Sequence, residues 1–143
     1  MIRPERIADV MGGAAILGRR IKTVDDLEKS ISHGLPKRAL RLTAERVSGS
    51  AGEARRMMFR IVPEATFKRR NRLSAAESER TERLARVIAA AEYTWDDRED
   101  ARAWLTRPHP ELGEQTPLDA AATELGARRV EDLLDRLLYG LAV

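Results

Sequence analysis

Residues 74–91 read SAAESERTERLARVIAAA, and this stretch decides the fold. It opens with Ser74 and carries Glu77 three residues later, which is the spacing of a capping box, a pair of side chains that accept hydrogen bonds from each other's backbone N–H groups at a helix start. Apolar side chains then recur three and four residues apart, as one face of a helix requires. They are Leu84, Val87, Ile88 and Ala91. The stretch predicts a long amphipathic helix in the middle of the chain.

The composition of the whole chain favours the same kind of structure. Aromatic residues make up 4% of the 143 residues, whereas Ala, Leu and Arg are abundant. Strands usually pack aromatic and β-branched side chains, so this balance favours helices. No run approaches the roughly 18 uninterrupted apolar residues that a membrane-spanning helix needs. We predict an all-α helical bundle without a membrane partner. We place it in the cytoplasm, because the chain lacks a signal-peptide core and cysteines.

Start and stop signals divide the rest of the chain into shorter helices. Thr23 and Thr116 stand where N-cap residues are expected, and Gly12, Gly34 and Gly126 stand where helices are expected to end. Besides the central helix, we expect helices over residues 4–11, 24–33, 36–47, 53–61, 63–70, 94–105, 117–125 and 130–139.

The segment from residue 94 to residue 110 carries an acidic run, Asp96-Asp97-Arg98-Glu99-Asp100, near its start. Such a run can suggest a cation site. However, an arginine interrupts it, and carboxylates are favoured at the positive end of a helix dipole, so we predict no metal there. Trp104 is expected in the core. Residues 107–110 are expected to be extended, because two prolines exclude a helix.

The charge is divided unevenly between the two halves of the chain. Residues 1–73 contain 17 Lys and Arg and 8 Asp and Glu, a net charge of +9, whereas residues 74–143 contain 9 Arg and 15 Asp and Glu, a net charge of −6. A basic surface neutralises phosphates, and an acidic surface repels them. We therefore predict a basic N-terminal region, 1–73, and an acidic C-terminal domain, 74–143, with different partners.

The basic half contains a candidate helix-turn-helix between Arg55 and Arg72. In this motif the second helix enters the major groove of DNA, and basic side chains around it contact phosphates. The expected DNA-binding residues are Arg55, Arg56, Thr66, Lys68, Arg69, Arg70 and Arg72. Phe67 is the expected anchor of the second helix in the core. The alternative is a basic, solvated helix pair that contacts no partner.

No catalytic constellation is apparent. His33 and His109 are the only histidines and lie far apart in the sequence. Neither a pair of histidines at metal-ligand spacing, nor a phosphate-binding glycine loop, nor a nucleophile elbow is present. His33 stands at a helix end, where a histidine commonly interacts with free carbonyls. We predict a binding protein without enzymatic activity, cofactor or metal.

The C-terminal half closely resembles the toxin-binding domain of the Xre/MbcA/ParS-like antitoxins. The motifs that carry the resemblance are Trp104-Leu105, Pro108-His109-Pro110, Leu112-Gly113, Thr116-Pro117-Leu118, Leu125-Gly126 and a final amphipathic helix that ends in Tyr139-Gly140. The preceding segment, Ala65 to Arg70 and Leu73 to Ser78, is similar to the central region of that family. The resemblance covers residues 61–140, and Glu114 departs from it by standing where a second glycine often follows.

The resemblance implies an antitoxin of a type II toxin–antitoxin pair. Its N-terminal half would bind operator DNA, and its C-terminal half would cover the active site of a RES-type toxin that consumes NAD, or of a toxin that transfers ADP-ribose. A pocket for the NAD pyrophosphate is expected to be basic, which the acidic half complements. The side chains expected to contact the toxin are Arg107, His109, Glu111 and Glu114 in the proline-rich loop and Leu141 and Val143 in the tail.

A second interpretation remains open from the sequence: a helix-turn-helix transcription regulator whose C-terminal half only dimerises. Both interpretations predict a homodimer, because two-fold operator sites usually require two copies of the reading helix. The gene neighbourhood separates the two interpretations: an adjacent gene for a RES-type toxin would favour the antitoxin.

Overall fold

The structure is a computed structural model that describes residues 2–140. Its helices are α1 (Pro4–Val10), α2 (Gly13–Leu17), α3 (Val24–His33), α4 (Lys37–Val47), α5 (Ala51–Ile61), α6 (Glu64–Arg69), α7 (Ala75–Trp95), α8 (Arg98–Leu105), the 3-10 helix η1 (Pro110–Leu112), α9 (Pro117–Ala120) and α10 (Glu124–Leu138). Apart from one isolated bridge between Pro36 and Arg72, residues 2–140 form only helices and loops. The predicted all-α fold is confirmed. None of these helices is long and apolar enough to cross a membrane.

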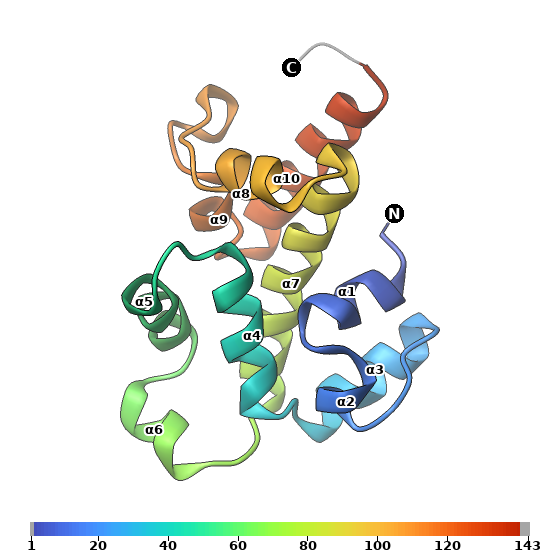
Figure 1. Ribbon diagram of the computed structural model, residues 1–143, viewed down its shortest axis with the longest axis vertical. Coiled ribbons are helices and arrows are strands. Elements are labelled where there is room, and N and C mark those ends of the chain that lie inside the picture. The colour runs from blue at the N-terminus through green and yellow to red at the C-terminus, as the bar shows by residue number, and fades with distance from the viewer. Residues whose placement is uncertain (1, 141–143) are drawn as a thin grey trace.

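The predicted long helix, α7, is the central element of the molecule (Figure 1). Its capping box is formed as expected, with Ser74 Oγ accepting from Glu77 N at 3.1 Å and Glu77 Oε1 accepting from Ser74 N at 2.8 Å. Burial extends well beyond the expected apolar stripe, and Ser78, Thr81 and Ala85 are fully buried. The reason is that α7 is covered from several sides, by α1, α3 and α4 and by α8 and α10.

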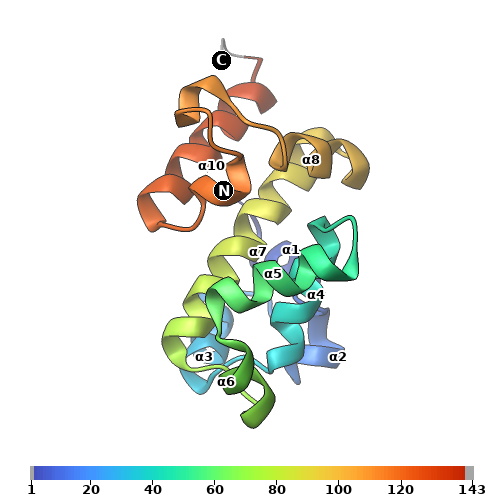
Figure 2. The ribbon, with the colours of Figure 1, turned by 90° about the vertical axis from the view of Figure 1, so that its left-hand side faces the viewer.

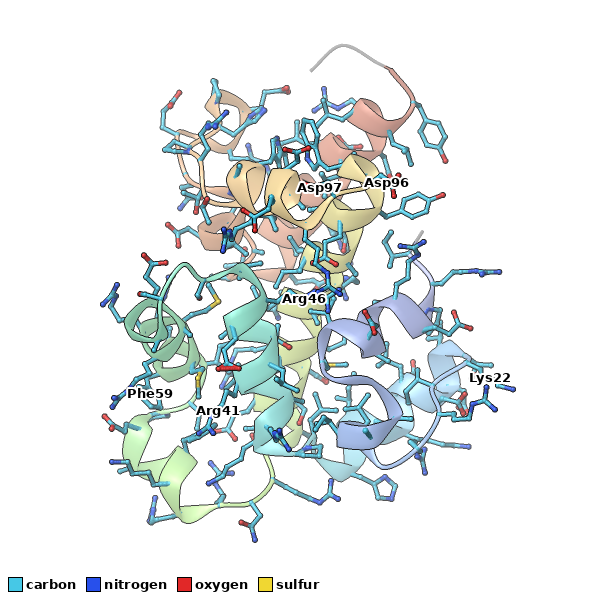
Figure 3. All side chains as sticks on the ribbon, in the orientation of Figure 1. Lys22, Arg41, Arg46, Phe59, Asp96 and Asp97 are labelled. Atoms are coloured by element: carbon cyan, nitrogen blue, oxygen red, sulfur yellow. The ribbon has the colours of Figure 1, made fainter. Side chains whose placement is uncertain are left out.

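Helices α1, α3 and α4 pack against α7, and α2 packs against α1 and α4. The backbone N–H of Leu35 donates to the buried Ser78 Oγ at 2.8 Å. Arg46 on α4 donates two hydrogen bonds to the carboxylate of Glu92, at 2.7 and 2.8 Å, and a longer one to Asp9 at 3.2 Å (Figure 3). Arg46 therefore ties α1, α4 and α7 together through one side chain.

The last part of α7 carries the C-terminal helices, which lie at the opposite end of the molecule from α3 and α6 (Figure 2). Arg86 joins α7 to α10 by pairing with Glu82 at 2.7 Å, Glu131 at 2.6 Å and Glu124 at 3.1 Å. Burial raises the pKa of Glu82, which is only 7% exposed. Arg86 compensates part of that cost, because its charge favours the ionised carboxylate.

The two acidic residues that open the acidic run separate α7 from α8 (Figure 3). The expected helix start at Thr94 is wrong, because α7 continues to Trp95 and ends at Asp96, whose φ of 50° is left-handed. Asp97 then caps α8 by accepting from Asp100 N at 2.8 Å. Trp104 is half-buried rather than fully buried, which also differs from the expectation.

Two further boundaries differ from the expectation. Gly126 does not end a helix but lies in the first turn of α10, where Thr123 is the N-cap. A Cβ at this position would lie 1.7 Å from the carbonyl oxygen of Ala120, so the close approach of α9 requires glycine. The proline-rich loop is extended only up to His109, since Pro110 opens the 3-10 helix η1. The division at residues 73 and 74 remains a prediction.

Candidate nucleic-acid and protein interfaces

Helices α5 and α6 form the predicted helix–turn–helix pair. Ser50 caps α5, and the buried Val62 with Pro63 makes a turn of two residues before α6 begins. Phe67 is 5% exposed and packs its ring edge-on against Phe59, with 6.0 Å between the ring centroids. Lys37 on α4 donates to the carbonyl oxygen of Phe67 at 3.0 Å. Phe67 is therefore the anchor of α6, as its sequence position suggested.

The face of α6 that points away from Phe67 consists of Ala65 and Arg69. Residues two positions apart in a helix are rotated by about 200°, so both lie nearly opposite the anchor. Both are exposed, and so is Lys68 beside them. Thr66, which the sequence suggested as a base contact, is half-buried, and its Oγ1 lies 3.5 Å from Arg69. The small exposed side chain of Ala65 was not singled out from the sequence.

Two of the expected DNA-binding cations share one carboxylate. Glu64 lies 3.2 Å from Arg55 on α5 and 3.2 Å from Lys68 one turn along α6. The hydrogen bond from Lys68 and its charge, together with the charge of Arg55, lower the pKa of Glu64 below its ordinary value. The Glu64–Lys68 pair has the i, i+4 spacing that the sequence displays, whereas the contact with Arg55 depends on the turn between the helices.

Two other expected DNA-binding cations contact the scaffold. Arg70 lies 3.0 Å from Glu77 at the start of α7, and Arg72 donates to the carbonyl oxygen of Gly34 at 2.8 Å. Burial raises the pKa of Glu77, but the hydrogen bonds from Ser74 and the charge of Arg70 outweigh it, and the pKa lies below its ordinary value. Within residues 2–140, Arg56 forms no ion pair and is exposed.

The proline-rich loop places two of its four expected contact residues in internal roles. His109 is the N-cap of η1, with Nδ1 accepting from Glu111 N at 3.1 Å, and its ring lies 6.2 Å from that of Trp104. The Glu111 carboxylate pairs with Arg136 on α10 at 3.1 Å, and its carbonyl oxygen accepts from Arg129. These contacts attach the loop to α8 and α10.

The other two loop residues, Arg107 and Glu114, are exposed and form no ion pair within residues 2–140. Glu114 has a φ of 67°, a left-handed conformation that L side chains rarely adopt. The departure noted at this position thus coincides with a backbone conformation that suits glycine. Leu141 and Val143, the expected contacts in the tail, lie outside the described residues.

Residues 2–140 contain no group of three or more His, Cys, Asp or Glu that is arranged to hold a metal ion. The acidic run and His33, which were considered from the sequence as possible metal ligands, lie at the ends of helices instead. Asp96 and Asp97 stand at the end of α7 and the start of α8, and Nδ1 of His33 lies 2.8 Å from the carbonyl oxygen of Lys29.

Two family models match this chain, one before residue 87 and one after residue 89. A family model described as the antitoxin Xre-like helix-turn-helix domain matches residues 26–86, and one described as the antitoxin Xre/MbcA/ParS C-terminal toxin-binding domain matches residues 90–140. The chain is 35% identical over 85 residues to a protein named antitoxin Xre from Yersinia enterocolitica, covering 56% of this chain and 57% of the relative. It is 31% identical over 84 residues to one of the same name from Pseudomonas putida, covering 56% and 53%. The chain thus spans about half the length of the curated relatives it matches.

Proposed function

Because this chain belongs to the Xre/MbcA/ParS-like antitoxin family, we propose that it is the antitoxin of a type II toxin–antitoxin pair. It neutralises its toxin by covering the active site with its C-terminal helices, and it represses its own operon by binding DNA. The observation that carries this proposal is the joining of two dissimilar units by α7: a basic helix–turn–helix pair at one end and an acidic helical unit at the other.

The DNA interface is proposed to be the outer face of α6. Ala65 and Arg69 face outward, so they are the side chains that would reach base edges in a major groove. An alanine methyl suits contact with a thymine methyl group, and an arginine suits the two acceptors of guanine. Lys68, Arg55 and Arg56 flank this face and would contact phosphates. Arg70 and Arg72 would contribute less, because they are engaged with the scaffold.

The toxin interface is proposed to lie around the loop between α8 and α9. Arg107 and Glu114 are its accessible charged side chains, and the tail residues Leu141 and Val143 extend the same proposal. His109 and Glu111 hold the loop in shape, so that little conformational entropy is lost when it enters a cleft. The division of labour within the loop is therefore two contact residues and two positioning residues.

The toxin is proposed to be a RES-type protein that consumes NAD, or one that transfers ADP-ribose. Such a toxin needs a basic pocket for the pyrophosphate, and the net charge of −6 on residues 74–143 favours association with it. The chemistry would belong to the toxin, and we propose that this chain has neither enzymatic activity nor a cofactor. We also propose a cytoplasmic homodimer, since a two-fold operator requires two copies of α6.

Co-expression with the product of the adjacent reading frame tests the toxin proposal. The full chain is expected to restore growth to cells that the adjacent gene product arrests and to co-purify with it. The double charge reversal Arg107→Glu with Glu114→Arg is expected to weaken both effects, whereas Glu79→Arg, an exposed change on α7, leaves them intact. Growth arrest that persists despite soluble full-length chain would refute the antitoxin proposal.

Binding to the chain's own promoter fragment tests the DNA proposal separately. A retarded complex that survives excess non-specific DNA is expected, since specific binding typically exceeds non-specific binding by about 10³-fold or more. Promoter binding without growth rescue would favour the second interpretation, a transcription regulator whose C-terminal half only dimerises. If the chain does not bind the promoter fragment, the autorepression proposal is refuted. The toxin-neutralisation proposal is then decided by the growth test alone.

A further inference from the structure

A cleft of about 520 Å³ lies between α4, α5 and α6 and is separate from the outer face of α6. Figure 2 shows the ribbons of these three helices, whose side chains line the cleft. Its apolar lining includes Ala54, Met58 and the rings of Phe59 and Phe67. Phe59 is half-buried, so part of its ring remains accessible from the cleft. Because Ala54, Met58 and Phe67 are at most 5% exposed, the accessible apolar surface that the cleft offers to a small molecule is mainly the ring of Phe59.

The rim of the same cleft is basic. Its lining holds four cationic side chains, Lys37, Arg41, Arg55 and Lys68, against two carboxylates, Glu45 and Glu64, which leaves an excess of two positive charges. Three of the cations lie over the phenyl rings: Lys37 and Arg41 over Phe67 at 4.9 and 5.7 Å from its centroid, and Arg55 over Phe59 at 5.9 Å.

Of the four cations that line the cleft, Arg41 has the fewest partners within residues 2–140. Lys37 donates to Phe67 O, and Arg55 and Lys68 share Glu64. By contrast, Arg41 contacts only the ring of Phe67 and forms no ion pair within residues 2–140 (Figure 3). An exposed guanidinium beside an apolar cavity is suited to an anionic group, because it provides a planar set of donors that matches phosphate oxygens.

Occupation of this cleft would act on α6. This helix has six residues and is joined to its neighbours mainly by the buried Phe67, the bond from Lys37 and the pairing of Glu64 with Arg55. All four side chains line the cleft. A molecule that contacts them therefore contacts the groups that fix the orientation of α6.

We propose that the cleft binds a small phosphate monoester that carries a flat ring, of the class of a nucleoside monophosphate, and that its binding sets the position of α6. A phosphate monoester carries a charge of about −1.5 to −2 at neutral pH, which matches the charge excess of the lining. The ring would lie against Phe59, with the phosphate at Arg41 and Lys37. This ligand site is separate from the proposed toxin surface and from the outer face of α6, and it shares Arg55 and Lys68 with the flank of the proposed DNA surface.

Calorimetry and amide-shift NMR on the full chain with AMP, adenosine and inorganic phosphate test the proposal. AMP is expected to bind more tightly than either fragment and to shift amides of α4, α5 and α6. Arg41→Gln removes the free cation and is expected to weaken AMP binding about tenfold, as for loss of one charged hydrogen bond. Ala51→Phe places a ring at the exposed edge of the cleft and is expected to abolish binding.

The matched control is Arg38→Gln, which removes the same charge from α4 at an exposed position outside the cleft. It is expected to leave AMP binding unchanged. Equal weakening by the two α4 variants, equal binding of AMP and inorganic phosphate, or binding of duplex DNA without any binding of AMP would each overturn the proposal. These readouts need neither an operator nor a toxin, so they are independent of the proposed antitoxin function.

Discussion

The two ends of the molecule handle their charges in opposite ways. At the α5–α6 end, exposed cations outnumber carboxylates, and Arg56 and Arg69 have no carboxylate partner within residues 2–140. Where α8 to α10 pack on α7, two arginines are paired with carboxylates of the same chain: Arg86 contacts three of them, and Arg136 pairs with Glu111. At the first end the charges of Arg56 and Arg69 stay exposed to solvent, whereas at the other end Arg86 and Arg136 use theirs to hold the helices of the chain together.

The comparison shows that the net charge of a segment is a guide to an interface only when the side chains that form ion pairs within the chain are left out of the count. The basic half keeps an excess of exposed positive charge, although Arg70 pairs with Glu77 and Arg72 donates to the carbonyl oxygen of Gly34. The acidic half, once the partners of Arg86 and Arg136 are set aside, retains exposed carboxylates such as Glu114. The four predictions that follow test this difference, beginning with the largest effect.

Removing the hub of the acidic end is expected to have the largest effect. Arg86→Ala leaves Glu82, which is 7% exposed, without its cation, and breaking a buried pair in this way costs about 3 kcal/mol or more in the free energy of unfolding. Urea denaturation measures the change. Arg128→Ala is the matched control, since Arg128 is exposed and its contact with Glu124 is a long one, at 3.9 Å. The free energy of unfolding is expected to fall by less than about 0.5 kcal/mol in this variant. Similar losses in the two variants would mean that Arg86 does not lock α10 to α7.

At the basic end, Arg69 and Arg70 are adjacent in sequence but differ in their partners. Arg69→Ala is expected to weaken promoter binding by about 1–3 kcal/mol, because Arg69 lies on the outward face of α6. Arg70→Ala is expected to change promoter affinity little and to lower stability instead, since Arg70 pairs with Glu77. Fluorescence anisotropy and urea denaturation separate the two effects. Equal losses of affinity would show that internal pairing does not withdraw Arg70 from DNA.

Glu114 sharpens the comparison within the acidic end. Glu114→Gly is expected to raise the free energy of unfolding by about 1 kcal/mol, because it relieves a left-handed backbone at φ 67°. The same change should weaken co-purification with the toxin. Gly113→Ala is the reverse control, since its φ is 65° and an added Cβ meets no atom within 4 Å, so it is expected to lose a similar amount. A Glu114→Gly protein that is no more stable than the parent would contradict this account.

The pair of Glu77 with Arg70 gives the smallest effect and a pH dependence. The pKa of Glu77 lies below its ordinary value of 4.5 in the folded protein. Its ionised form therefore stabilises the fold above that pH, and the contribution is lost as the pH falls through the folded-state pKa. Glu77→Gln keeps the capping geometry and is expected to cost about 0.5–1 kcal/mol at pH 7. The difference should shrink as the pH falls below 4.5 and through the lowered pKa of Glu77, and a difference that does not change with pH would point to a lost hydrogen bond rather than a lost charge.

Local signals in the sequence were sufficient for most of the fold. Ser74 with Glu77, Thr23 and Gly34 mark helix ends where the structure has them, because caps depend on residues within one turn. Gly126 was misread, because its role depends on the approach of Ala120 from the preceding helix, which no local pattern reveals. The end of α7 was placed too early for a similar reason, as Asp96 adopts a left-handed conformation that glycine or asparagine more often provides.

The helices that carry the candidate DNA site were predictable from the sequence, but the partners of their side chains were not. The basic pattern located α5 and α6, and Phe67 was correctly taken as the anchor. Which cations are free was not predictable, because the partners of Arg55, Arg70 and Arg72 lie across turns or on distant segments. In the proline-rich loop, the exposed Glu111 has an ion-pair partner only because α10 brings Arg136 to it.

The length of α7 has a geometric consequence for the two proposed partners. Its 21 residues correspond to roughly 31 Å along the helix axis, with α6 before its first residue and α8 after its last. This helix would fix both the distance and the relative rotation between the proposed DNA and toxin surfaces. By helix geometry alone, two residues inserted into its buried middle would turn the far end by about 200°, whereas seven would nearly restore the original direction.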